Sequence, residues 1–242
     1  DYTYDGKPAY EVPARNIMPD PLKQSDYFIA QHGYVAPSNQ AFYNNDRLNP
    51  YDYGAGSKFY WIRPAAVGGK SLIWGRWSFR WSPADFEANK REGIGGDWPI
   101  RYDDLAPWYS KVETVIGVAG SKEGLPQLPD GEFLPEFPLN DGELMFKAAV
   151  EAKFPGRKVI SGRTANLSKA APHHEELGRS TCQARSLCER GCSLGAYHSS
   201  LSSTLPAADR TRRVLAYELL IATNAVRSII RENQLHQLDN VL

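Results

Sequence analysis

The stretch Val67-Gly68-Gly69-Lys70-Ser71-Leu72-Ile73-Trp74-Gly75 decides how this chain is interpreted. Adjacent glycines allow positive φ angles and let backbone N–H groups approach a ligand closely. Ser71 adds a hydroxyl donor, Trp74 adds a flat aromatic surface, and Gly75 lets the chain turn past it. Such a loop suits a diphosphate and a ring system. The spacing alone favours a tight turn between two strands.

Aromatic residues follow the loop directly. Trp77, Phe79 and Trp81 alternate with polar residues, and this alternation predicts a strand. The segment 82–85, Ser-Pro-Ala-Asp, then predicts the start of a helix. Its serine can serve as N-cap, its proline fits the first helical position, and its aspartate favours the positive end of the helix.

Two further helices are predicted downstream. The first has Pro107 in its first turn, Gly117 and Gly120 as stops, and an apolar face formed by Leu105, Trp108, Tyr109, Val112, Val115 and Ile116. The second covers 141–153, because the spacing of Asn140 and Glu143 is that of a capping box. Short strands are predicted at 158–160 and within 217–231.

Composition limits the classes of function. The 242 residues are 42% hydrophobic and 23% charged, which is typical of a globular protein. Lys and Arg together number 28, as do Asp and Glu, so no basic field attracts nucleic acid. No apolar run is long enough to span a membrane. We divide the chain into an irregular segment 1–56, a loop-and-helix region 57–120, a region 121–210 and returning strands in 211–242.

Several separated motifs share one family pattern. They are the segment 63–75, Arg-Pro-Ala-Ala followed by the glycine loop, then 82–86 (Ser-Pro-Ala-Asp-Phe), 97–100 (Asp-Trp-Pro-Ile) and 102–109 (Tyr-Asp-Asp-Leu-Ala-Pro-Trp-Tyr). In this order they resemble the glucose–methanol–choline oxidoreductase family, and are most similar to its bacterial sugar dehydrogenase branch. The resemblance covers most of residues 45–210. It implies a mixed α/β fold, namely part of an FAD-binding flavoprotein with part of the substrate or cap region.

The resemblance also implies a cofactor and a reaction. FAD would be contacted by Val67, Gly68, Gly69, Ser71, Leu72, Trp74 and Gly75, with Val226 near the adenine. Ile73 stands where some relatives carry a His bonded to the flavin, so we expect non-covalent FAD. The reaction implied is hydride transfer from a CH–OH group of a sugar or related alcohol to the flavin.

The three cysteines of the chain, Cys182, Cys188 and Cys192, fall within eleven positions. Thiolates suit iron–sulfur clusters or zinc, and zinc would need a fourth ligand such as His198. Unlinked thiols, or one disulfide with a spare thiol, fit the residues as well. By resemblance, some sugar dehydrogenases of the family hold a three-iron four-sulfur cluster at this spacing. Such a cluster would pass electrons from the flavin to a cytochrome or a small subunit.

Two family features are missing from the chain. None of its 20 glycines forms the G-x-G-x-x-G turn of a dinucleotide-binding fold. No catalytic base is identified: His32 is interpreted as structural, His173, His174 and His198 as exposed, and His236 lacks the family's motif. We therefore expect a fragment lacking both ends. The alternatives are a non-catalytic binding protein of the same fold and a metal-binding domain organised by the cysteines. The compartment would be periplasmic if the chain is like cluster-bearing relatives, and otherwise cytoplasmic.

Overall fold

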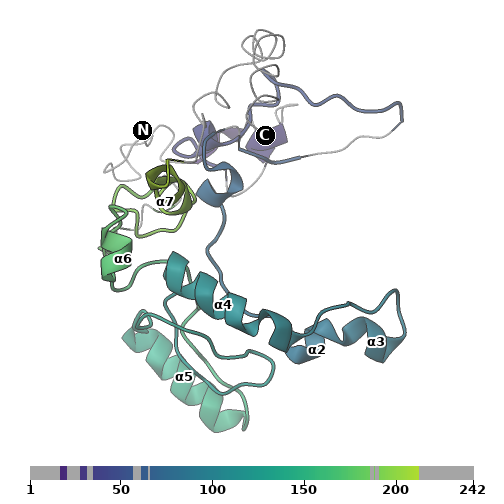
Figure 1. Cartoon of the computed structure of the whole chain (residues 1–242), viewed down its shortest axis with the longest axis vertical. Helices are drawn as coiled ribbons and strands as arrows, with labels where there is room; N and C mark the ends of the chain where they lie inside the picture. The colour runs from purple at the N-terminus through teal and green to yellow at the C-terminus, as the bar shows by residue number, and fades with distance from the viewer. Residues whose placement is uncertain are drawn as a thin grey trace.

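The computed structural model describes residues 17–20, 28–31, 35–56, 61–64, 66–185, 188 and 191–212. These residues curve into the shape of a letter C (Figure 1). The helices of the described part are η3 (Phe28–Gln31), η4 (Gln40–Phe42), η5 (Gly69–Leu72), α2 (Pro83–Phe86), α3 (Ala88–Glu92), α4 (Tyr102–Ile116), α5 (Asp141–Lys153), α6 (Pro172–Glu175) and α7 (Thr204–Arg210). The arm ending in α2 and α3 lies across the opening from residues 35–56.

Local sequence signals set the ends of the helices. At α2 the Asp85 carboxylate accepts from the Ser82 N–H at 2.7 Å, and Pro83 is the first helical residue, as predicted. At α5 Asn140 and Glu143 form the predicted reciprocal capping box. Helix α4 ends at the left-handed Gly117, but it begins at Tyr102. Pro107 therefore lies inside α4 and not in its first turn, which corrects the prediction.

Extended segments pair through isolated bridges and not through strands in the described residues. The central segment is 163–167, which bonds to residues 76–78, to Ala119 and to residues 196–198. Helices and isolated bridges together agree with a mixed α/β class, while the flavoprotein fold stays a prediction. The pairing of 163–167 brings the end of the glycine loop beside the segment that follows the cysteines.

The strand predicted at 158–160 is wrong. Its polar backbone groups bond to side chains of α5 in place of a neighbouring strand. The Val159 N–H donates to Glu151 Oε1 at 3.1 Å, and Lys147 Nζ donates to the Val159 carbonyl at 2.6 Å. The strands predicted within 217–231, and Val226 with them, lie outside the described residues.

The strand predicted from the alternation of Trp77, Phe79 and Trp81 is wrong, because only Trp77 forms an isolated bridge; the alternation is present, but its faces are reversed. Arg76, Arg80 and Ser82 are buried, whereas Trp77 and Trp81 are exposed. Helix α4 shows the same reversal, because its buried residue is Glu113 while much of its predicted apolar face is exposed. The cause in both cases is polar, since Arg80 and Glu113 bond to each other in the interior.

The apolar core is small. One cluster of buried residues joins the described parts of the first 43 residues: Met18, Ile29, Ala30, Val35 and Tyr43, with Ile62 and Ile73 packed against it. Helix α5 contributes no buried residue. Among the described residues, no helix is long and apolar enough to cross a membrane.

Candidate functional site

The glycine loop is a left-handed turn followed by η5. Gly68 and Gly69 have φ angles of 97° and 54°, so both use the conformation that glycine adopts freely. A Cβ on Gly68 would meet the Leu72 side chain at 3.1 Å, whereas a Cβ on Gly69 would meet nothing within 4 Å. Position 68 therefore needs glycine for the turn and the packing. The backbone at Gly69 stays open to an approaching group.

Ser71 fastens the loop to the segment after the cysteines. Its hydroxyl donates to the Gly68 carbonyl at 2.5 Å and lies 2.8 Å from the hydroxyl of Ser200. The Ser200 N–H in turn donates to Ser71 Oγ at 2.9 Å. This hydroxyl, considered above as a donor to a ligand, is thus engaged within the protein. Contact of Ser71 with FAD stays a prediction.

Trp74 and Arg76 connect the loop to the same segment. The indole N–H of Trp74 and the Nε of Arg76 both donate to the His198 carbonyl, at 3.1 and 2.9 Å. Arg76 also donates to the carbonyls of Ser71 and Leu72, and its guanidinium lies over the ring of Tyr197. Arg76 was not among the site residues predicted from the sequence. Its position two residues before Ser78 in an alternating segment was the available signal.

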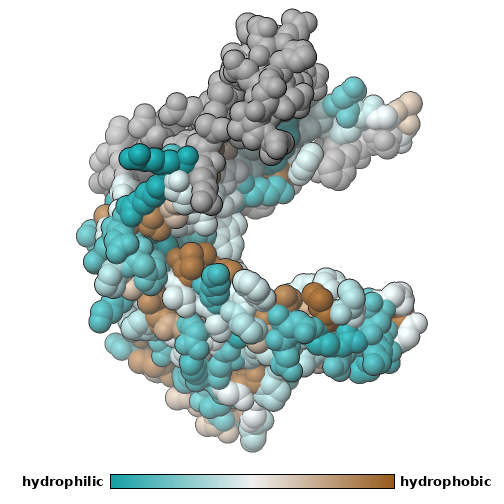
Figure 2. Space-filling model, in the orientation of Figure 1, coloured by the Kyte–Doolittle hydropathy of each residue, from teal (hydrophilic) through white to brown (hydrophobic). Residues whose placement is uncertain are grey.

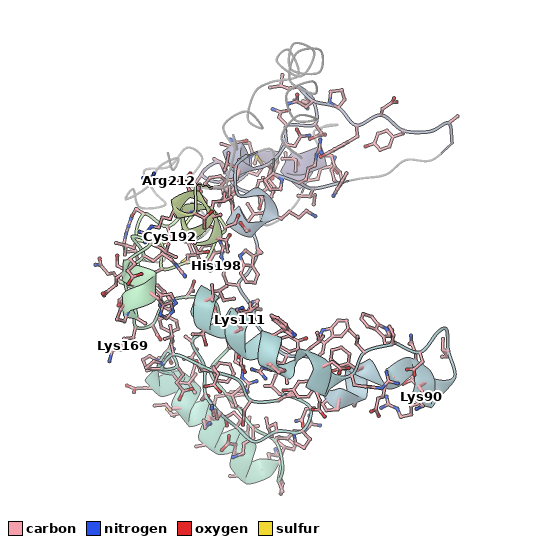
Figure 3. All side chains as sticks on the ribbon, in the orientation of Figure 1. Lys90, Lys111, Lys169, Cys192, His198 and Arg212 are labelled. Carbon is pink, nitrogen blue, oxygen red and sulfur yellow. The ribbon has the colours of Figure 1, made fainter. Side chains whose placement is uncertain are left out.

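The three cysteines are free, and they line a single hollow. The remaining lining residues are Gln183, Arg185, Gly191, Leu194 and Ala196. A second hollow shares Gly191 and Cys192 with the first and reaches Leu72 of the glycine loop. The region lies between α6 and α7, where Figure 3 labels Cys192 and His198. The predicted ligand trio is therefore gathered beside the predicted flavin loop.

The cysteine sulfurs interact electrostatically. Burial raises the pKa of the Cys188 thiol, the neighbouring Cys182 and Cys192 raise it further, and Arg76 opposes them. No three His, Cys, Asp or Glu side chains in the described part of the chain are arranged to hold a single metal ion. Zinc with His198 as the fourth ligand and an iron–sulfur cluster therefore both stay predictions. Three free cysteines that line one hollow supply the number of thiolates that the cluster requires.

A second buried arginine supports the cysteine loop. Arg179 Nε donates to the Gly195 carbonyl at 2.9 Å, three residues after Cys192. Its other nitrogens donate to the carbonyls of Val115 and Ile116, at 3.4 and 2.8 Å. The last carbonyls of a helix carry partial negative charge and lack partners within it, so they suit a cation. Arg179 thereby ties the end of α4 to the cysteine loop.

Two histidines of this region are buried, contrary to the sequence interpretation. His174 is 0% exposed and His198 is 8% exposed, whereas His173 is exposed as expected. Burial, with nearby positive charge, lowers the pKa of each to about 4. His198 Nδ1 lies 3.1 Å from Ser203 Oγ. Both imidazoles are therefore neutral structural groups at pH 7. His32 and His236 lie outside the described residues.

Comparison with known proteins points to one class of enzyme. No family model matches the chain. The chain is 27% identical to the fructose dehydrogenase large subunit of Gluconobacter japonicus over 206 residues, which is 80% of this chain and 35% of that protein. It is 31% identical to paromamine 6'-oxidase of Streptomyces fradiae over 134 residues, or 54% of this chain and 23% of the oxidase.

A third relative aligns with a shorter stretch of this chain. It is the 2-methyl-1,2-propanediol dehydrogenase of Mycolicibacterium austroafricanum, 39% identical over 67 residues, 26% of this chain and 12% of that enzyme. The chain is thus similar in sequence to oxidoreductases, by name one oxidase and two dehydrogenases. It spans between 12% and 35% of the length of these three relatives.

Proposed function

We propose that this chain is the flavin-contacting and cysteine-bearing part of an FAD-dependent oxidoreductase of the glucose–methanol–choline type. The proposed reaction oxidises a CH–OH group of a sugar or related alcohol. Two observations support the class of reaction: the motifs between residues 63 and 109, and similarity to enzymes named for fructose, paromamine and a propanediol, which all carry hydroxyl groups.

The observation that carries the proposal is the joining of two predicted sites in one small region. Ser71, Trp74 and Arg76 bond directly to the segment 197–200, which follows the cysteines. A chain that merely turned at Gly68 would have no need to fix this turn against the segment that follows the three cysteines. An enzyme that moves electrons from a flavin to a cluster needs the two within short reach of each other.

The residues of the glycine loop fit a flavin nucleotide. The open backbone at Gly69 allows a phosphate or ring to approach, and the exposed Lys70 adds a positive charge beside it. The residues proposed to contact FAD remain Val67, Gly68, Gly69, Ser71, Leu72, Trp74 and Gly75, with Val226 by resemblance. We propose that Cys182, Cys188 and Cys192 hold a three-iron four-sulfur cluster. When bound, FAD supplies a hydride acceptor and the cluster supplies a one-electron carrier.

The described residues bind and position in this proposal, and a catalytic base is not assigned among them. His174 and His198 are buried and their ring nitrogens have partners inside the protein, so neither is assigned this role. An electron-accepting cytochrome or small subunit is proposed as the partner. The fructose dehydrogenase relative is itself named as a large subunit.

Cofactor analysis of anaerobically purified protein tests the proposal. We expect flavin absorbance, together with iron and acid-labile sulfide. Cys188→Ser should lose the iron and sulfide but keep the flavin, and Ser193→Ala, in the same loop, should lose neither. A colourless protein without iron would favour the non-catalytic binding protein, and stoichiometric zinc would favour the cysteine-organised metal domain. Either result would sink the proposal.

A further inference from the structure

The described residues contain four buried arginines, and they divide into two pairs. Arg80 bonds to the Glu113 carboxylate at 2.6 Å, and Arg163 bonds to Asp130 at 2.8 Å. Arg76 and Arg179 are each 1% exposed, yet no carboxylate in the described part of the chain forms an ion pair with either. Their partners are backbone carbonyls, together with the ring of Tyr197 for Arg76. This difference in partners calls for an explanation.

An uncompensated buried charge is costly. Removing a cation from water costs several kcal/mol even after the protein relaxes, and carbonyl dipoles return only part of this cost. Burial accordingly lowers the pKa of both Arg76 and Arg179 to about 10, so both still carry their charge at neutral pH. A negative group close to both would offset the cost that these two side chains incur.

The cysteines are the groups in the right place. The Arg76 charge interacts with Cys188 and Cys192, and the Arg179 charge interacts with Cys192. Arg76 also lines the hollow that contains Gly191 and Cys192. Arg179 packs against Gly195, where an added Cβ would meet its Cγ at 3.1 Å. The two arginines without carboxylate partners are therefore the two that adjoin the cysteine loop.

We propose that Arg76 and Arg179 are the counter-charges of an anionic iron–sulfur cluster at Cys182, Cys188 and Cys192, and that they raise its reduction potential. This inference rests on the cluster in the proposed function. Reduction adds one electron and one negative charge to the cluster, so a nearby fixed cation favours the reduced form. Arg76 has a second role, because it bonds to the glycine loop and to His198 and so positions the cluster relative to the flavin site.

A redox titration of the anaerobically purified protein, with dithionite as the electron donor and the cluster followed by electron paramagnetic resonance, tests the inference. We expect Arg76→Gln and Arg179→Gln to lower the midpoint potential by about 59 mV or more each, which is a tenfold change in a one-electron equilibrium. Arg76→Lys and Arg179→Lys keep the positive charge, so the midpoint potential should stay close to the wild-type value. Lys90→Gln is the matched control, because Lys90 lies at the tip of the distant arm (Figure 3).

The outcomes distinguish a failure of the counter-charge role from a failure of the proposed cluster. A cluster whose potential is unchanged in the Gln variants, or shifts equally in the Lys and Gln variants, would overturn the counter-charge role and leave the proposed function intact. A wild-type protein without iron and sulfide would overturn both. If a Gln variant at one position does not fold, as judged by circular dichroism, the Lys and Gln variants at the other position still decide the result.

Discussion

At the scale of single residues, a pair of buried charges determines which side chains of residues 76–82 point into the protein. The Arg80 guanidinium donates to both carboxylate oxygens of Glu113, at 2.8 and 2.6 Å, and to Tyr102 and Ser110. Glu113 also accepts the Glu132 N–H at 2.9 Å. The bond to Glu113 comes first among the causes that raise the pKa of Arg80. A network this complete pulls Arg80 inward and leaves the alternate aromatic residues on the surface.

Replacing Glu113 with Gln tests this network. The amide keeps the shape of the carboxylate but turns a donor toward groups that are themselves donors, and it leaves Arg80 buried without its counter-ion. We expect a loss of about 3 kcal/mol or more in the free energy of unfolding, measured by urea titration. Glu92→Gln removes the acidic partner of the exposed Arg91–Glu92 pair. This variant should change the free energy of unfolding by less than about 0.5 kcal/mol. Equal effects of the two variants would refute the role of the network.

His174 makes stability depend on pH. The Ala171 N–H donates to its Nδ1 at 3.2 Å, so that nitrogen is unprotonated, while Nε2 faces the Thr114 carbonyl at 3.1 Å. Burial first, and then the charges of His173 and Arg179, lower its pKa to about 4, against an ordinary value of 6.5. The unfolded chain therefore binds a proton at a higher pH than the folded chain does. The contribution of neutral His174 to the free energy of unfolding is fully present above pH 6.5 and is lost as the pH falls toward 4.

We expect this decrease to reach roughly 3 kcal/mol for His174, because one pKa unit corresponds to about 1.4 kcal/mol. His198 has a similarly lowered pKa and should contribute a comparable amount. His174→Gln should therefore remove about half of the histidine-driven loss between pH 6.5 and 4, as seen in urea midpoints across that range. His173→Gln, at the exposed neighbouring position, should leave most of the dependence in place. If the urea midpoint of His174→Gln depended on pH as steeply as that of the wild type, His174 would not be a source of the pH dependence.

At the scale of elements, α5 is the helix whose stability depends most visibly on its cap. It buries no side chain, so little tertiary packing supports it. Asn140 Oδ1 accepts the Glu143 N–H at 3.0 Å, and Glu143 accepts the Asn140 N–H at 2.8 Å. Asn140→Ala should destabilise the helix by about 1 kcal/mol, and Asn140→Gly by only a few tenths. Amide hydrogen exchange within α5 would show the difference, and equal exchange in the two variants would argue against the cap.

Elements set by neighbouring residues could be predicted, and those set by distant partners could not. The caps at Ser82 and Asn140 and the stop at Gly117 depend on contacts within a few positions, and all three are confirmed. The strand at 158–160 failed because α5 supplies the partners of Val159. The same limit applies to the site: the clustering of the cysteines was visible in the sequence, whereas burial of Arg76 depends on the distant His198 carbonyl.

At the scale of the whole molecule, much apolar surface remains uncovered in the described part of the chain. On α4 the exposed fractions of Trp108, Val112 and Val115 are 60%, 52% and 42%, and these positions share one face of the helix. Figure 2 shows apolar surface on α4 where the helix borders the opening of the C. Contiguous apolar surface of this kind marks a place that another part of a protein covers.

A hydrophobic dye offers a direct measurement of this face. The 242-residue chain should bind an apolar fluorescent dye, and the triple replacement Trp108→Gln, Val112→Gln and Val115→Gln should reduce the fluorescence severalfold. Gln has a higher helix propensity than Trp or Val, so α4 should remain helical by circular dichroism. Thr114→Gln, at an exposed position of the same helix that points away from these three side chains, is the control and should leave dye binding unchanged. Undiminished fluorescence in the triple variant would mean that the dye binds elsewhere, and that the α4 face is not the main exposed apolar surface of the described residues.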